Sequence, residues 1–210
     1  MIRILMADDH PVVRKGLKQI LLETGEFDVE DVASIPEVRE ALQRSTPQVL
    51  LLDINMPGGS GLEFIQEVRQ LHPKLPVLIL SVYPEEQVGV RALAAGANGY
   101  LNKESAPELI VEAVKKLRAG GRFITPGLAE RMADWIQAPK ESLDPHLQLS
   151  GRENTVFLMI ALGKSNGEIA TDLNLSPKTV STYRTRIFEK MGMSSAAELA
   201  RYAVERNLLH

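Results

Sequence analysis

An apolar run, Gln48-Val49-Leu50-Leu51-Leu52, ends at the carboxylate of Asp53 and is typical of a strand buried on both faces. A second apolar run, Ile2-Arg3-Ile4-Leu5-Met6-Ala7, ends at the acidic pair Asp8 and Asp9. Strands of this kind belong to parallel sheets, and binding sites of open α/β sheets form where their carboxyl ends meet. We therefore expect the three carboxylates to lie together at one edge of a sheet.

The chemistry expected of such a site follows from its charge. Neighbouring carboxylates repel one another unless a cation neutralises them, and a hard divalent ion with oxygen ligands is the usual solution. The sequence therefore predicts a Mg²⁺ site. With a metal ion and the ammonium of Lys103 on either side, the oxygen of Asp53 becomes a feasible nucleophile toward phosphorus. The expected product is an aspartyl phosphate.

The composition limits the class of protein. The chain has 210 residues, more than one typical domain of about 100 to 150 residues, so we expect two domains. No window approaches the ~20 apolar residues that cross a bilayer, and the amino terminus lacks the regions of a signal peptide. We expect a cytoplasmic protein without membrane contact. The absence of cysteine excludes disulfides and thiol chemistry, and four histidines without ligand spacing argue against zinc.

The charge distribution gives only weak information about partners. The formal net charge is −3, whereas residues 146–210 carry eight Lys and Arg against six Asp and Glu, an excess of +2. Proteins that bind nucleic acid usually have strongly basic patches. A prediction of DNA binding therefore has to rest on a motif.

The chain divides into two parts with different patterns. Up to residue 120, apolar runs alternate with amphipathic stretches, which predicts five βα units around a parallel sheet. The breaker-rich stretch 138–145 is interpreted as a linker, after which the spacing is purely helical. We expect strands near 2–8, 27–33, 48–53, 76–81 and 98–101, with helices near 11–24, 36–45, 60–71, 85–95, 106–119 and 125–137.

Charged and polar groups follow four of these strands in a distinctive order. Asp8 and Asp9 follow the first strand, Asp53 the third, Ser81 the fourth and Lys103 the fifth. Each alone has an ordinary explanation, such as a helix cap or a solvated surface group. Together with the segments 6–10, 52–58 and 95–103 they resemble the receiver domain of bacterial two-component response regulators, over about residues 1–120. The resemblance implies a flavodoxin-like (βα)5 fold.

The same resemblance implies roles for individual residues. Asp53 would be the phosphoacceptor, Lys103 would bind the phosphoryl oxygens, Ser81 would donate its hydroxyl to the phosphate, and Tyr100 would change its orientation. Mg²⁺ would be held by Asp9, by Asp53, by the Asn55 backbone carbonyl and, through water, by Asp8. Ser81 replaces a threonine that is common in receivers, and Glu104 follows Lys103 where a proline is common. Neither departure removes a required group.

A second motif lies near the carboxyl terminus. Residues 165–173 are predicted to form a short helix, and Ser176-Pro177 opens another. An ordinary helical hairpin with a solvated polar face is the alternative. The segments 149–153, 163–170 and 175–183 resemble the LuxR-type helix-turn-helix, a likeness that covers 149–208. It implies a recognition helix near 177–191, with Ser181, Thr182 and Thr185 facing bases. Candidates for phosphate contacts are Lys178, Thr179, Tyr183, Arg184 and Arg186.

The two resemblances together indicate a response regulator of the NarL/FixJ type and not a turnover enzyme. A cognate sensor histidine kinase would phosphorylate Asp53 and thereby control sequence-specific DNA binding and transcription. We expect a receiver at 1–120, a linker with a short helix at 121–145 and a DNA-binding domain at 146–210. A homodimer formed after phosphorylation, through the last helix near 195–206, is expected, and RNA polymerase is a candidate partner.

Three alternatives stay open from the sequence. The first is a DNA-binding regulator whose receiver works without phosphate, although all five receiver residues are present. The second is a Mg²⁺-dependent phosphohydrolase, which would need an acid or base that Asn55, two residues after Asp53, cannot provide. The third is an adaptor whose helical domain binds protein, and salt-sensitive DNA binding would separate it from the others.

Overall fold

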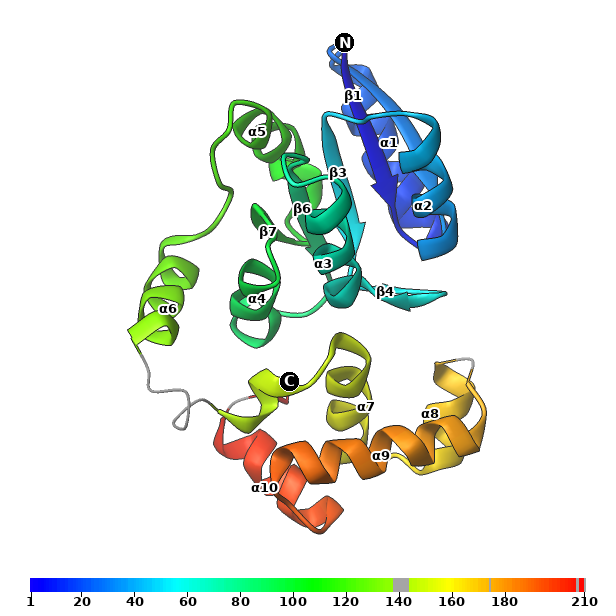
Figure 1. The fold of residues 1–210 in the computed structure, drawn as a ribbon, viewed down its shortest axis with the longest axis vertical. Coiled ribbons are helices and arrows are strands. Elements are labelled where there is room, and N and C mark those ends of the chain that lie inside the picture. Colours follow the sequence, from blue (N-terminus) through cyan, green and yellow to red (C-terminus); the bar gives the residue numbers. More distant parts are fainter. Residues whose placement is uncertain (138–143, 174, 207, 210) are drawn as a thin grey trace. The chain divides into compact units, whose positions relative to one another are not determined.

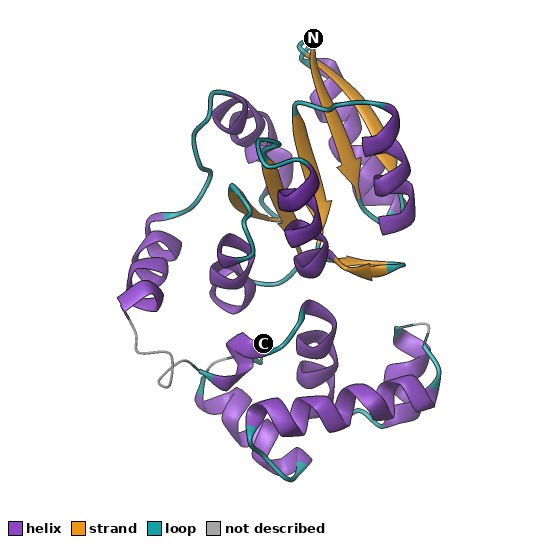
Figure 2. Cartoon of the chain, in the orientation of Figure 1, coloured by secondary structure: helices purple, strands orange, loops and turns teal. Residues whose placement is uncertain are grey.

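A computed structural model describes residues 1–137, 144–173, 175–206 and 208–209 (Figures 1 and 2). The chain forms two compact units, Met1–Ala138 and Pro139–His210. Most of the predicted linker at 138–145 lies outside the described residues. None of the helices in the described ranges is both long and apolar enough to cross a membrane.

The first unit is built on a five-stranded parallel sheet with the order β2-β1-β3-β6-β7. The flavodoxin-like (βα)5 prediction for this part of the chain is confirmed. The strands and helices lie within a few residues of their predicted positions. Their bounds are β1 Ile2–Ala7, α1 Pro11–Glu23, β2 Phe27–Val32, α2 Ile35–Arg44, β3 Val49–Asp53, α3 Gly61–Leu71, β6 Val77–Ser81, α4 Glu85–Ala94, β7 Gly99–Asn102 and α5 Ala106–Arg118.

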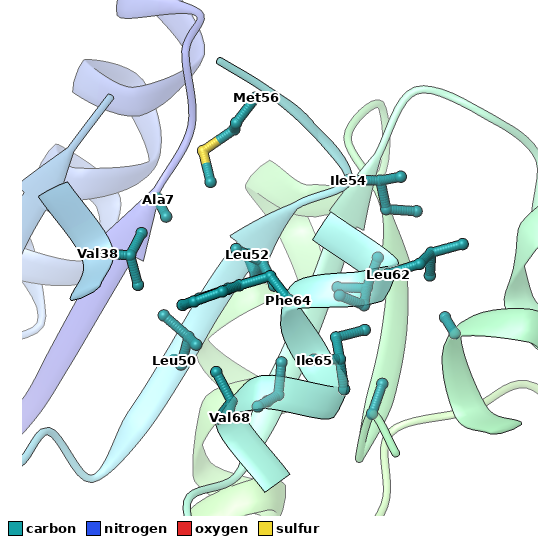
Figure 3. Close-up of a cluster of buried hydrophobic side chains, with 14 of the residues drawn as sticks. Ala7, Val38, Leu50, Leu52, Ile54, Met56, Leu62, Phe64, Ile65 and Val68 are labelled. Carbon is teal, nitrogen blue, oxygen red and sulfur yellow. The ribbon is translucent and has the colours of Figure 1, made fainter. Parts of the chain in front are cut away.

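Two apolar cores cover the two faces of this sheet. Successive residues of β3 point to opposite faces, so Leu50 and Leu52 belong to one core while Val49 and Leu51 belong to the other. Helices α2, α3 and α4 complete the first core, part of which Figure 3 shows. Helices α1 and α5 complete the second. Burial on both faces explains why β3 contains no polar residue before Asp53.

The segment after β3 is ordered. Two short strands, β4 Asn55–Met56 and β5 Gly59–Ser60, pair antiparallel there. Gly58 permits the turn because its φ of 92° lies in the left-handed region. At Gly61, a Cβ atom would lie 2.7 Å from the Asp53 carbonyl oxygen, so only glycine allows α3 to begin this close to β3.

Helix α6, Pro126–Gln137, packs against α4 within the first unit. Leu128 is fully buried, and a Cβ on Gly89 of α4 would lie 2.7 Å from a Leu128 methyl group. The Thr125 hydroxyl donates to the carboxylate of Glu85. Trp135 packs against the first core. The helix predicted at 125–137 therefore closes the first unit.

The second unit is helical throughout its described residues, as predicted. It contains the 3-10 helix η2 Pro145–Gln148 and the helices α7 Gly151–Ala161, α8 Asn166–Asp172, α9 Pro177–Met191 and α10 Ala196–Glu205. The four α-helices each begin at a serine whose side chain accepts a backbone N–H, and α7 and α8 have complete capping boxes. The sequence also predicts a turn at Asn174-Leu175 between α8 and α9, and Asn174 lies outside the described residues.

Candidate functional site

The three carboxylates predicted to meet do meet at the carboxyl ends of β1 and β3, whose arrowheads point to the same edge (Figure 1). Oxygen atoms of Asp8, Asp9 and Asp53 and a ring nitrogen of His10 all lie within 4.8 Å of one another. Asp8 and Asp53 are buried, whereas Asp9 and His10 are accessible. The edge therefore combines a closed interior side with an open side from which a ligand can enter.

Lys103 follows β7 and reaches the same cluster. Its Nζ lies 2.7 Å from Asp53 Oδ2 and 2.8 Å from Asp8 Oδ2, and its side chain is 5% exposed. Backbone pairing fixes its position, because the Lys103 N–H donates to the Ser81 carbonyl at 2.8 Å. One ammonium thus serves two buried carboxylates, and the cluster keeps an excess of negative charge.

Burial and charge act in opposite directions on these groups. Burial raises the pKa of Asp53 to about 6, although Lys103 and the Asn55 N–H partly oppose the shift. Burial alone would lower the pKa of Lys103, but the carboxylates of Asp53 and Asp8 raise it above its ordinary value. At neutral pH the site therefore presents an ionised but poorly solvated carboxylate next to a fixed ammonium.

The donor set fits a hard divalent cation. Carboxylate oxygens on one accessible edge are the ligands that Mg²⁺ uses in proteins. Asn55 adjoins the cluster, since its N–H donates to Asp53 Oδ1 at 3.1 Å. Sequence reasoning missed His10, whose Nδ1 lies 2.6 Å from Asp9 Oδ1 and 3.8 Å from Asp53 Oδ2. Its position directly after Asp9 was the available signal.

Ser81 and Tyr100 lie on the neighbouring strands, and both side chains are buried. Ser81 follows Leu80, the residue that pairs with Asp53, so its hydroxyl lies one residue beyond the phosphoacceptor candidate along the sheet edge. The Tyr83 N–H donates to Ser81 Oγ at 3.2 Å, and the Tyr100 hydroxyl donates to the Tyr83 carbonyl at 2.6 Å. The two predicted switch residues therefore share one loop residue, Tyr83.

Helix α9 has an apolar side and a polar side. Val180, Ile187 and Met191 are buried in the second unit. Hydroxyls of Thr182 and Thr185 donate to carbonyls one turn earlier, which orders both side chains on the helix surface. The predicted base-facing and phosphate-contacting residues are exposed at Lys178, Ser181, Thr182, Thr185 and Arg186 and half-buried at Thr179, Tyr183 and Arg184.

A buried carboxylate also joins the helices of the second unit. Glu153 is 3% exposed and accepts the Ser150 N–H at 2.7 Å and the Lys190 ammonium at 2.6 Å. Burial alone would raise the pKa of Glu153, but Lys190 and Ser150 lower it below its ordinary value. This network connects the start of α7 to the end of α9.

Comparison with known proteins extends these observations to the whole chain. Residues 4–115 match the response regulator receiver domain, and residues 147–203 match the LuxR family of bacterial regulatory proteins. The chain is 35% identical to the response regulator UvrY of Escherichia coli K12, over 99% of this chain and 96% of that protein. It is 37% identical to the response regulator GacA of Pseudomonas aeruginosa, over 100% and 98%.

Solved structures give the same result. RcsB from Salmonella enterica serovar Typhimurium, bound to the rprA promoter with the phosphomimetic BeF₃⁻, matches 97% of this chain and 99% of its own. The TM-score is 0.62 at 25% sequence identity. The chain therefore belongs to the NarL/FixJ-type response regulators, which are transcription regulators and not enzymes and which combine a receiver domain with a LuxR-type helix-turn-helix.

Proposed function

We propose that Asp53 accepts a phosphoryl group from a sensor histidine kinase and that this modification controls DNA binding by the helix-turn-helix. The observation that carries the proposal is the burial of Asp53 between the Lys103 ammonium and the acidic pair. The family matches at 4–115 and 147–203 support a receiver at 1–120, a linker with a helix at 121–145 and a DNA-binding domain at 146–210.

The transfer is a substitution at phosphorus. An oxygen of Asp53 bonds to phosphorus while the bond to the donor, a histidine nitrogen of the kinase or an oxygen of a small phosphodonor, breaks. Lys103 is already 2.7 Å from Asp53, so its ammonium can stabilise the negative charge of the arriving phosphoryl oxygens without moving. Burial leaves the carboxylate poorly solvated, which keeps water from competing for it.

We infer that Mg²⁺ is the cofactor of this step. Asp9, Asp53 and the Asn55 backbone carbonyl would hold the ion, with Asp8 acting through water. When bound, the ion supplies positive charge that neutralises the carboxylates and the transferring group. His10 is close enough to Asp9 to compete with a cation for that carboxylate.

The switch proposed for the receiver is electrostatic. Phosphorylation adds close to two negative charges and new acceptor oxygens at Asp53. A Ser81 hydroxyl that turns to the phosphate would give up the Tyr83 N–H it now accepts. Since Tyr100 donates to the carbonyl of the same residue, movement of Tyr83 would carry Tyr100 with it. The surface around Tyr100 would change in response.

The second unit would read DNA through α9. The hydroxyls of Ser181, Thr182 and Thr185 would face base edges. The phosphates would be contacted by Lys178, Thr179, Tyr183, Arg184 and Arg186. The weak basic excess of this domain favours a homodimer on DNA, assembled after phosphorylation through α10. The RcsB complex with a promoter supports the DNA-bound form. A cytoplasmic location follows from these partners, and RNA polymerase is a further candidate.

The receiver proposal is tested by intact mass after incubation with Mg²⁺ and acetyl phosphate. We expect one phosphoryl adduct on the unaltered chain and none on Asp53→Asn. Asp28→Asn, an exposed carboxylate on β2, is the matched control and should retain the adduct. No adduct from acetyl phosphate or from a kinase donor would instead favour a phosphate-independent regulator.

The DNA proposal is tested by the dependence of binding on salt. Each of the variants Lys178→Gln and Arg186→Gln should reduce the slope of log K against log[salt] by about one. Lys164→Gln is the control, because that ammonium is paired with Asp172 at 2.6 Å. Binding without salt dependence would favour the adaptor alternative.

A further inference from the structure

The loop that carries the acidic pair precedes a helix that has no side-chain cap. Helix α1 begins at Pro11, and His10, at its N-cap position, makes no capping hydrogen bond with its side chain. At the start of α2, by contrast, the Ser34 side chain accepts a backbone N–H. A helix start without a side-chain cap does not fix the preceding loop, so other contacts must hold residues 8–10 in place.

Two such contacts are made by the backbone of Asp8, in addition to the His10 N–H that donates to Asp8 Oδ1 at 2.8 Å. Its N–H donates to the Val32 carbonyl at the end of β2, at 3.2 Å. Its carbonyl accepts the Arg14 guanidinium, Nη1 to oxygen, at 2.5 Å. Both backbone groups of Asp8 are therefore held, one by the sheet and one by a side chain of α1.

Arg14 is itself held by Asp31, the residue before Val32. The Arg14 Nε lies 3.0 Å from Asp31 Oδ2, and the Lys18 Nζ lies 2.5 Å from Asp31 Oδ1. Arg14 and Asp31 are partly buried, with side chains 17% and 27% exposed. A hydrogen bond from Lys18 lowers the pKa of Asp31, so this carboxylate stays ionised at neutral pH. The end of β2 thus clamps both sides of the Asp8 peptide.

We propose that Arg14, oriented by Asp31, is a positioning residue that fixes the Asp8-Asp9 loop for divalent-cation binding. This inference rests on the proposed Mg²⁺ site. The planar guanidinium can bond Asp31 through Nε and the Asp8 carbonyl through Nη1 at once, whereas a lysine ammonium lacks that fixed fork. Residues that orient metal ligands typically change metal affinity by about tenfold or more when altered.

Charge and positioning predict opposite results at this residue. Removing a cation near an acidic site should tighten Mg²⁺ binding if only long-range electrostatics matter. Losing the clamp should weaken binding, because the loop then samples other conformations. Arg14→Gln therefore separates the two effects by sign, and Arg14→Lys isolates geometry because it keeps the charge.

The experiment is a calorimetric Mg²⁺ titration of the full chain. We expect Arg14→Lys and Arg14→Gln to bind Mg²⁺ about tenfold more weakly, with unfolding temperatures in EDTA close to that of the unaltered chain. Arg39→Gln is the matched control, since it removes a guanidinium that forms a bidentate ion pair with Glu67 on the surface. If Arg14→Lys fails to fold, Asp31→Asn carries the test, because it leaves Arg14 in place but unoriented.

A second measurement does not depend on the metal. Amide hydrogen exchange of residues 8–10 in EDTA should be faster in Arg14→Lys than in the unaltered chain, with exchange in β3 unchanged. Equal or tighter Mg²⁺ binding by Arg14→Gln, or unchanged exchange in Arg14→Lys, would overturn the inference. If the unaltered chain binds no Mg²⁺, the proposed cofactor fails, while the exchange result still decides whether Arg14 positions the loop.

Discussion

Each unit contains a buried carboxylate next to a lysine ammonium, Glu153 in the second unit and Asp53 in the first, but the pKa values of the two carboxylates shift in opposite directions. In the second unit, Glu153 is matched by the Ser150 N–H and by Lys190, and its pKa falls. In the first unit, Asp53 shares Lys103 with Asp8, and its pKa rises to about 6. The same two functional groups, a carboxylate and an ammonium, thus form a fully paired structural contact in one unit and a site with excess negative charge in the other.

The difference shows that the degree of compensation, not burial itself, distinguishes a structural carboxylate from a reactive one. A buried charge with all its hydrogen bonds stabilises the fold, whereas one left short of partners retains affinity for an added cation or a phosphoryl group. Substitutions of the two carboxylates should therefore change the stability of their units in opposite directions and by different amounts.

The largest difference is expected in chemistry. Lys103→Ala should slow phosphorylation by acetyl phosphate about 100-fold, because it removes the charge aimed at the phosphoryl oxygens. Lys190→Ala, the equivalent change beside Glu153, should leave the rate unchanged. Intact mass followed over time measures both rates. An unaltered rate in Lys103→Ala would show that the two lysines do not differ in role.

Glu153→Gln should destabilise the second unit by about 2 kcal/mol, since it replaces charge-assisted bonds to Lys190 and Ser150 by weaker neutral ones. Hydrogen exchange of α7 and α9 in the full chain measures the loss. The control is Glu205→Gln, an exposed residue of α10 that is 3.7 Å from Arg201 and should have little effect. Equal losses in both variants would contradict a special role for the buried network.

Asp53→Asn should stabilise the first unit by about 1 to 2 kcal/mol at neutral pH without divalent ions. This effect is opposite in sign to that of Glu153→Gln. Because the pKa is raised, the folded unit holds a proton between about pH 4 and about pH 6 that the unfolded chain has already lost, and above this range the ionised, buried carboxylate destabilises the fold. Stability of the unaltered unit should therefore fall as pH rises from about 4 to about 6, and the variant should lack this contribution. Fluorescence of Trp135, the single tryptophan, follows unfolding of this unit. A destabilised variant at neutral pH would mean that the attraction between Lys103 and the Asp53 carboxylate exceeds the cost of burying that carboxylate.

The smallest effect concerns the cap of α7. Ser150→Ala should lower the free energy of unfolding of the second unit by about 1 kcal/mol, because the Glu153 backbone N–H loses the serine hydroxyl that accepts its hydrogen bond in the capping box. Ser150→Asp should recover most of the loss, since aspartate also accepts N–H groups at this position. Thermal unfolding followed by circular dichroism compares the variants. Failure of aspartate to recover stability would indicate that the hydroxyl acts by packing and not by capping.

The elements and the reactive cluster could be predicted from sequence because they depend on local signals. An apolar run that ends in a carboxylate predicts both the strand β3 and the edge at which Asp53 lies. The order of Asp8, Asp53 and Lys103 after successive strands resembles that of receivers, and this resemblance predicts that the three side chains form one cluster. The Lys103 ammonium lies within hydrogen-bond distance of both carboxylates.

What the sequence did not reveal depends on the approach of distant residues. The Arg14–Asp31 clamp joins residues 17 apart whose types are ordinary for a helix surface and a strand end. The docking of α6 on α4 relies on the missing side chain of Gly89, which has no pattern of its own. His10 was overlooked because a lone histidine shows no ligand spacing, although the fold brings three carboxylates to it.

The packing of α6 against α4 determines how much chain is available between Phe123 and Pro145. With α6 docked, the covalent path from Gln137 to Pro145 spans eight residue steps, or about 30 Å when fully extended. Phe123 stays bound to the sheet through its backbone. Release of a still-folded α6 would add its own length of ~18 Å and the short segment from Phe123, which roughly doubles the reach to about 60 Å. The contacts that hold α6 on the first unit, Leu128 and Trp135 among them, therefore determine how much of the chain between Phe123 and Pro145 is free to extend.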